Sequence, residues 1–212
     1  MFNILILLSC VFLACAEILH QHKFLIDNEN WSIIGNKNYE HAVHQSYNID
    51  NARLSHYIMF KDNLINVDYK NKNDKTLWYF RSPDITINEE YKPGTTIFVK
   101  NKKQIKIPQL LTFTMTSFVG DFNKLNENVA LVKLKNKNMC LVFKAPQYDG
   151  KIREFNVPFI ISLWEREHNY NNKKALTQEE FNNMFIGTFS IEILGDWTQG
   201  MEVVGLDNVI IM

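Results

Sequence analysis

The stretch Gly205-Leu206-Asp207-Asn208-Val209-Ile210-Ile211 is an apolar run with a single acidic residue at its centre. An ionised carboxylate in a hydrophobic strand is costly unless a cation or backbone donors compensate it. A second acid, Asp27, lies near the beginning of the chain, close to Phe24 and Trp31. If the first and last strands are neighbours, both acids lie where these two strands meet. The sequence therefore predicts a closed β-sandwich.

Between these ends the apolar residues follow a period of about two, and not the helical period of about 3.6. Residues 105–107, 110–115 and 132–135 alternate apolar and polar side chains, as half-buried strands do. Turn signals such as Pro93-Gly94 and Asp149-Gly150 separate the runs. About ten strands with short connections predict an all-β jelly-roll sandwich. The other runs expected to form strands are 31–34, 57–60, 85–87, 97–99, 140–143, 159–163, 186–194 and 203–211.

One short helix is expected among the strands. Thr177-Gln178-Glu179-Glu180 has the pattern of a capping box, in which the Thr and the second Glu each satisfy a backbone N–H group of the other. The helix that it opens should cover residues 178–185 and carry Phe181 and Phe185 on one face.

Residues 1–16 have the form of a secretion signal. They are apolar, carry no charged side chain and end in Ala14-Cys15-Ala16, a small-x-small cleavage pattern. A lipidated bacterial signal using Cys10 or Cys15 is the alternative. Residues 17–212 then form one domain of about 195 residues, enough for a well-buried core. No later run reaches the roughly 20 apolar residues of a transmembrane helix, so we expect a secreted protein in the secretory lumen or at an extracellular surface.

Charge and cysteine content narrow the classes of partner. Lys and Arg number 23, as do Asp and Glu, so the formal net charge is zero. No overall field draws such a chain to nucleic acid or anionic lipid. Cys140 is the one cysteine after the signal and stands in the apolar run 139–143. We expect it to be a buried small hydrophobe, with an intermolecular disulfide as the alternative.

Six motifs follow one another in order along the chain. They are 78–83 (WYFRSP), 111–115 (LTFTM), 129–132 (VALV), 157–159 (VPF) with Trp164, 177–181 (TQEEF) and 205–209 (GLDNV). This ordered set resembles the laminin IV domain, also called laminin B, over about residues 27–211. The resemblance implies a galactose-binding-like jelly roll. The cysteine-rich EGF-like modules that accompany the domain in laminins are missing here, so we expect a stand-alone relative.

The abundance of Asn, Lys and Ile resembles that of proteins from AT-rich genomes, such as those of malaria parasites and other protozoa. We expect a non-catalytic extracellular recognition or adhesion module that binds a glycan or a cell-surface or matrix partner. The alternative is a protein–protein interaction subunit of a secreted complex without sugar affinity, in parasite gamete or host-contact biology. Both expectations rest on the resemblance, because a fold does not fix a function.

Asp27 and Asp207 are the candidate metal ligands. Jelly rolls of the kind that the resemblance implies often hold a cation between the first and last strands, and oxygen ligands suit Ca²⁺. We therefore expect a structural calcium ion there, with Glu29 as a competing ligand from the same loop. In the alternative, Asp207 accepts backbone N–H bonds at a turn.

Two aromatic residues are the candidate ligand-binding residues, since Trp and Tyr rings stack on sugar rings. They are Trp197, in the loop 195–200, and Tyr91, before Pro93-Gly94. Three other tryptophans, Trp31, Trp78 and Trp164, are expected in the core. Asn30-Trp31-Ser32 is an N-glycosylation sequon, which makes Asn30 the candidate glycosylation site.

Nothing in the sequence predicts an enzyme. A nucleophile motif, a phosphate loop and a Rossmann fingerprint are all missing. Catalytic zinc needs three ligands brought together, whereas His20 and His22 lie beside the cleavage site and are expected to be solvated. Glu89 and Glu90 point to opposite faces if they lie on a strand. A carbohydrate-active enzyme would need two carboxylates facing each other.

Overall fold

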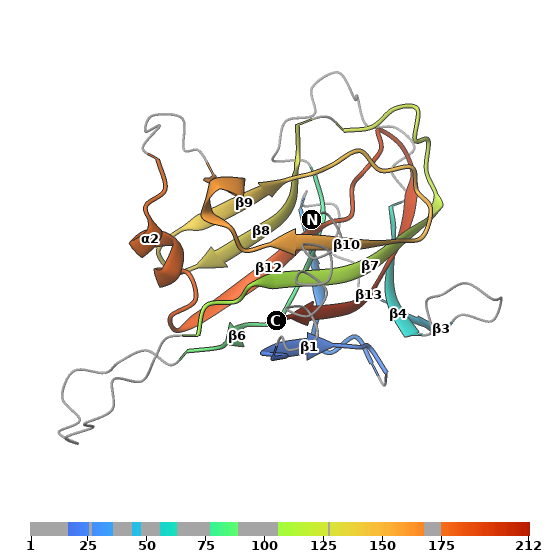
Figure 1. Cartoon of the computed structure of the whole chain (residues 1–212). Helices are drawn as coiled ribbons and strands as arrows, with labels where there is room; N and C mark the ends of the chain where they lie inside the picture. The colour runs from blue at the N-terminus through green and yellow to red at the C-terminus, as the bar shows by residue number, and fades with distance from the viewer. Residues whose placement is uncertain are drawn as a thin grey trace, which may run out of the picture.

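The computed structural model describes residues 17–25, 27–35, 44–47, 56–62, 77–88, 106–126, 128–167 and 175–212. These residues form two antiparallel sheets that face each other (Figure 1). The prediction of an all-β jelly-roll sandwich is confirmed. The signal predicted at residues 1–16 and the strand predicted at 97–99 lie outside the described residues.

The first sheet, called sheet A, is six-stranded. In spatial order it contains β10 (Arg153–Pro158), β7 (Leu110–Val119), β13 (Glu202–Ile211), β4 (His56–Asp62) and β3 (His44–Tyr47), with β1 (His20–His22) also paired to β13. Residues Gln21 and His22 of β1 lie opposite Ile210 and Val209. The first and last described strands are therefore neighbours, as the sequence predicts.

The second sheet, called sheet B, is seven-stranded. Its order is β11 (Trp164–Arg166), β9 (Cys140–Lys144), β8 (Ala130–Asn136), β12 (Thr188–Leu194), β5 (Tyr79–Arg81) and β2 (Ser32–Ile34), with β6 (Ile85–Thr86) also paired to β12. The runs expected at 31–34, 85–87, 132–135, 140–143 and 186–194 all supply strands to it.

Alternate residues of both sheets fill the core between them. Leu111, Phe113 and Met115 of β7 are each fully buried, as expected for the inward face of an alternating strand. Trp31, Trp78 and Trp164 are 2%, 0% and 3% exposed, which confirms their core assignment. Gly195 lies directly against Trp78, since a Cβ atom at this position would be 1.8 Å from Cζ3 of the indole. The core therefore requires glycine there.

The helix α2 (Gln178–Asn183) begins at the predicted capping box. The N–H of Thr177 donates to the Glu180 carboxylate at 3.0 Å, and the N–H of Glu180 donates to the Thr177 hydroxyl at 3.3 Å. The helix ends two residues earlier than expected. Phe181 and Phe185 are nevertheless both buried, 5.6 Å apart between ring centroids.

Two predicted strands are wrong. Residues 159–163 contain the 3-10 helix η2 (Ile161–Leu163) instead. There the N–H of Leu163 donates to the carbonyl of Ile160 at 2.9 Å, which closes a local turn in place of pairing with another strand. The described residues 106 and 107 of the run 105–107 are not in a strand.

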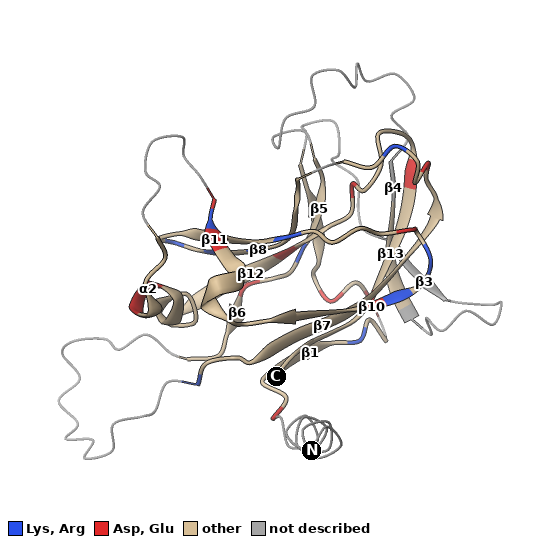
Figure 2. Cartoon of the chain, turned by 45° about the horizontal axis from the view of Figure 1, so that its top comes forward, with Lys and Arg blue, Asp and Glu red and all other residues tan. Residues whose placement is uncertain are grey.

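Charged residues are spread over the molecule in both signs (Figure 2), in keeping with the zero net charge. None of the described helices has the length and apolarity needed to cross a membrane.

Candidate functional site

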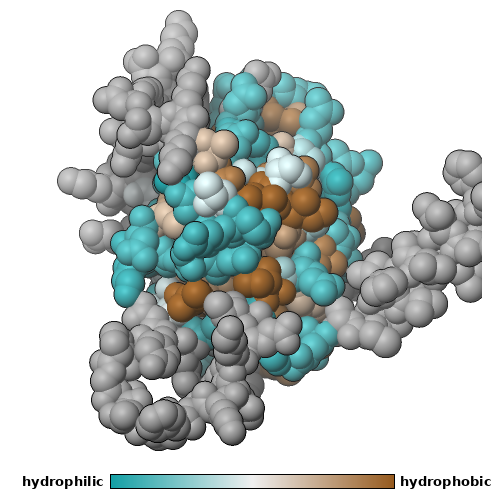
Figure 3. Space-filling model, turned by 60° about the vertical axis from the view of Figure 1, so that its left-hand side comes forward, coloured by the Kyte–Doolittle hydropathy of each residue, from teal (hydrophilic) through white to brown (hydrophobic). Residues whose placement is uncertain are grey.

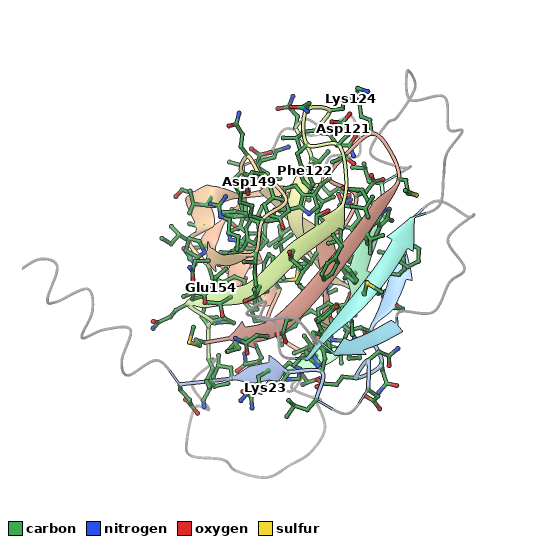
Figure 4. The ribbon with its side chains drawn as sticks, turned by 90° about the vertical axis from the view of Figure 1, so that its right-hand side faces the viewer. Lys23, Asp121, Phe122, Lys124, Asp149 and Glu154 are labelled. Atoms are coloured by element: carbon green, nitrogen blue, oxygen red, sulfur yellow. The ribbon has the colours of Figure 1, made fainter. Side chains whose placement is uncertain are left out.

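The outward surface of sheet A, called the outer face, is the candidate site. Alternation along β7 turns Leu111, Phe113 and Met115 to the core and therefore turns the threonines between them outward. The strand ends at Phe118 and Val119, which are 48% and 40% exposed. Figure 4 views the molecule from this side, with β7, β13 and β4 lying next to one another across the view.

Polar groups line up across the outer face. The register places Glu154 of β10 and Asp207 of β13 on either side of Thr114. Directly opposed residues of an antiparallel pair share a face, so two carboxylates flank one hydroxyl. Glu154 is exposed, whereas Asp207 is 7% exposed between its neighbouring strands. In a neighbouring row, Asn156 lies opposite Thr112.

An aromatic pair lies on the same face. The rings of Tyr57 on β4 and Phe118 on β7 are 5.5 Å apart between centroids. They meet over Gly205 of β13, where a Cβ atom would lie 3.0 Å from the Tyr57 ring and 3.1 Å from the Phe118 ring. Tyr57 is 7% exposed. Phe118 therefore presents an aromatic surface, supported from below, beside the row of hydroxyl and carboxylate groups.

Two loops border the outer face at the Phe118 end, where Figure 4 shows Asp121, Phe122 and Asp149. The backbone N–H of Asn123 lowers the pKa of Asp121, and the backbone N–H of Lys151 lowers the pKa of Asp149. Both carboxylates are exposed and stay ionised at neutral pH. This border can accept hydrogen bonds from hydroxyl groups of a ligand.

The outer surface of sheet B is different, because its charges are paired with each other. Lys133 contacts Glu167 at 2.5 Å and Lys135 contacts Glu192 at 2.9 Å. Lys133 and Glu192 are 7% and 1% exposed. Burial alone would lower the pKa of Lys135, but Glu192 outweighs it and the pKa is raised. We interpret this network as structural.

Cys140 lies beside that network. It is a free, half-buried thiol, and burial raises its pKa strongly. Such a thiol is a poor nucleophile at neutral pH, in line with the expected role as a small hydrophobe.

The side of the molecule that carries α2 also shows apolar surface, interrupted by hydrophilic residues (Figure 3). Ile160 and Leu163, between β10 and β11, are 54% and 45% exposed. No described aromatic residue is among the large hydrophobic residues exposed in this segment, which distinguishes it from the outer face.

The structure places Trp197, one of the two candidate ligand-binding residues, in the core. Its ring is 3% exposed and lies 4.6 Å from the Tyr148 ring and 5.8 Å from the Phe155 ring, between centroids. The loop is held inward because the N–H of Asn126 donates to the carbonyl of Trp197. A buried ring has no free face for a sugar. Tyr91, the other candidate, lies outside the described residues.

A buried acid holds this loop in place. The Glu202 carboxylate accepts the N–H groups of Trp197 and Thr198 at 2.8 and 3.0 Å and is fully buried. Burial raises the pKa of Glu202, and the nearby buried Asp196 raises it further. Sequence reasoning did not single out either acid, although both border apolar strands.

The two predicted metal ligands occupy different environments. Asp27 is exposed and its Oδ1 accepts the N–H of Glu29 at 2.6 Å, whereas Asp207 is buried on β13. Glu29 is already engaged, since its Oε1 accepts the N–H of Phe24 at 2.6 Å. Within the described residues no three His, Cys, Asp or Glu side chains form a group that could hold a metal ion. The structural calcium ion stays a prediction.

One comparison with known proteins bears on the fold. No family description and no curated protein matches the chain. The L4b domain of human laminin alpha-2 is similar, with a TM-score of 0.54 and 9% identity over 91% of this chain and 96% of that one. CtCBM11 in solution has a TM-score of 0.47 and 11% identity, over 94% of this chain and 97% of that one.

A third similar structure is the family 11 carbohydrate-binding module of cellulosomal cellulase Lic26A-Cel5E of Clostridium thermocellum. Its TM-score is 0.44 and its identity 10%, over 93% of this chain and 96% of that one. At such identities a likeness shows the fold alone. The laminin domain therefore supports the jelly-roll sandwich, and any ligand must be argued from the outer face.

Proposed function

We propose that this chain is a secreted, non-catalytic recognition module that binds a glycan through the outer face of sheet A. The observation that carries the proposal is the half-exposed ring of Phe118, supported by Tyr57 and bordered by hydroxyl and carboxylate groups. Sugar recognition combines an aromatic surface for the ring with polar groups that read the hydroxyls. The fold that the chain shares with a laminin domain is compatible with this role.

A protein partner is the second candidate, and one observation favours it. Val119 and Met201 are 40% and 39% exposed, and they lie at the Phe118 end of the outer face, where Val119 pairs with Val203. Contiguous exposed apolar side chains are typical of protein–protein contacts. The module would then bind an extracellular protein without affinity for sugar.

The test is a glycan array probed with the secreted chain and with two matched variants. Phe118→Ala removes the exposed ring, and Ile160→Ala removes a similarly exposed apolar side chain beyond the other end of β7. We expect Phe118→Ala to weaken binding by about tenfold, or about 1.4 kcal/mol, and Ile160→Ala to leave it unchanged. The melting temperatures of both variants serve as the control for folding.

The two candidates give different results. A silent array with well-folded protein contradicts the glycan proposal. In that case chemical cross-linking on living cells, compared between the chain and Met201→Asp, tests for a protein partner. Equal glycan binding by all three proteins shows that a ligand binds elsewhere than on the outer face.

A further inference from the structure

His20 and His22 face each other on β1. They are two residues apart on a strand, so their side chains project from the same face. Their Nε2 atoms are 2.9 Å apart, and the rings meet edge to face with centroids 4.7 Å apart. The expectation that they are solvated is wrong, because His22 is only 6% exposed.

The orientation of His22 is fixed from the other side of its ring. Its Nδ1 lies 2.6 Å from Oε2 of Glu29, and the other oxygen of that carboxylate accepts the N–H of Phe24. The ring packs at 5.3 Å from Trp31, edge to face. With the Nδ1 proton donated to the carboxylate, Nε2 of His22 accepts the hydrogen bond from Nε2 of His20. A metal ion on both nitrogens would replace the proton between them and release it to water. A carboxylate that orients the distal nitrogen of an imidazole is a recurrent feature of metal-binding histidines.

The spacing of the two Nε2 atoms fits a shared metal ion. With metal–nitrogen bonds of about 2.0–2.1 Å, a separation of 2.9 Å subtends an angle of about 90° at the metal. That angle suits two adjacent ligands of a square-planar or tetragonal ion such as Cu²⁺. A tetrahedral ion needs about 3.3–3.4 Å between the nitrogens, which requires the half-buried His20 to move.

We propose that His20 and His22 form a two-imidazole site for a divalent transition-metal ion, with Cu²⁺ preferred over Zn²⁺ and Glu29 as the positioning residue. In the part of the chain that the structure describes, no third His, Cys, Asp or Glu completes the group. Exchangeable water would occupy the remaining coordination positions. The site uses nitrogen ligands and differs from the predicted calcium site, which would use the oxygens of Asp27 and Asp207.

The location gives the ion a structural consequence. β1 is three residues long and is held to β13 through His20, Gln21 and His22. Glu29 connects His22 to the following loop. An ion on both imidazoles would fix the two rings of this short strand next to the carboxylate that links it to the loop, and a ligand that binds only the folded state adds to stability.

The test uses Cu²⁺ and Zn²⁺ alone, titrated into the secreted chain in a buffer without coordinating groups and followed by calorimetry. Electron paramagnetic resonance of the Cu²⁺ form reads the number of nitrogen ligands. We expect one Cu²⁺ per chain with two nitrogens, and weaker Zn²⁺ binding. His20→Gln should abolish the site and Glu29→Gln should weaken it about tenfold or more. His168→Gln, outside the described residues, is the composition-matched control.

Several outcomes overturn the proposal. Equal Cu²⁺ affinity in His20→Gln and the parent chain places the ion elsewhere, and no Cu²⁺ binding leaves a hydrogen-bonded histidine pair only. Tighter binding of Zn²⁺ than of Cu²⁺ contradicts the planar geometry. If His20→Gln fails to fold, paramagnetic broadening of the His20 and His22 ring resonances in the unmodified chain gives the same answer. None of these measurements involves a glycan, so the glycan proposal stands or falls separately.

Discussion

Replacing Gly195 by alanine should destabilise the protein far more than the same change five residues later. A Cβ atom at Gly195 would lie 1.8, 2.2 and 2.4 Å from three atoms of the Trp78 ring. Real contacts of this kind do not occur below about 3 Å, so the ring must move by more than 1 Å. Trp78 is fully buried and touches Phe60 and Phe80 at 4.8 and 5.3 Å between centroids. Any movement of the ring therefore disturbs these neighbours.

Overpacking a well-packed core costs about 1–3 kcal/mol and sometimes more. Because the clash is with a rigid ring, we expect Gly195→Ala to cost about 3 kcal/mol, at the upper end of that range. For a domain of this size each kcal/mol lowers the melting temperature by about 2–4 °C. The expected fall is therefore about 6–12 °C.

Gly200→Ala is the matched control. It lies in the same connection between β12 and β13, and a Cβ atom there meets nothing within 4 Å. Neither glycine has a positive φ, so neither position carries the strain of a left-handed backbone, and the contact with Trp78 is the difference. We expect Gly200→Ala to change stability by no more than about 0.5 kcal/mol. Thermal unfolding followed by circular dichroism measures both, and equal melting temperatures would refute the packing argument.

Three further predictions concern the acids and the sequon. Burial raises the pKa of Glu202, so the folded state holds the proton of this carboxyl more tightly than the unfolded state does. The free energy of unfolding should therefore fall as the pH rises above the unfolded pKa of about 4.3. Urea titrations from pH 4 to 8 should show this fall in the parent chain and a smaller one in Glu202→Gln. If the predicted calcium ion binds, Ca²⁺ at about 100 times its Kd should raise the free energy of unfolding by about 2.7 kcal/mol. A thermal-shift assay should show this stabilisation in the parent chain and not in Asp207→Ala. The absence of a shift in the parent chain would contradict calcium binding. Asn30 is exposed at a turn, so secretion from eukaryotic cells should add a glycan that peptide N-glycosidase removes; mass spectrometry shows it, and Asn30→Gln should lack it.

The strands could be predicted where apolar and polar residues alternate regularly, even though their neighbouring strands are far apart in sequence. The run 203–211 forms β13 because its many apolar residues suit a strand that is buried between two other strands. The start of α2 could be predicted because each of the two capping-box residues accepts the backbone N–H of the other, and both lie within four residues of sequence. The run 159–163 failed because its apolar residues are partly exposed in a turn that follows Pro158, and periodicity cannot distinguish the two cases.

The site was harder to predict than the fold. Trp197 looks exposed in a loop rich in Gly and Asp, but the loop folds inward over a buried carboxylate, a contact that no local pattern reveals. Phe118 could have been found by extending the alternation of 110–115 to the end of β7, where it stands in line with the outward threonines. Its partner Tyr57 comes from β4, and only the strand order brings the two together.

The position of β13 has a consequence for how the protein is made. It comes last of the described strands in the sequence, yet it lies between β7 and β4 and joins them into one sheet. During synthesis, the edges of β7 and β4 that pair with β13 have no partner strand until residues 202–211 have left the ribosome. Sandwiches that depend on pairing between strands distant in sequence fold slowly. The unpaired backbone groups of an exposed strand edge can also pair with another chain and cause aggregation. We therefore expect the nascent chain to rely on chaperones in its compartment, and a truncation before residue 202 to aggregate rather than to fold into a smaller domain.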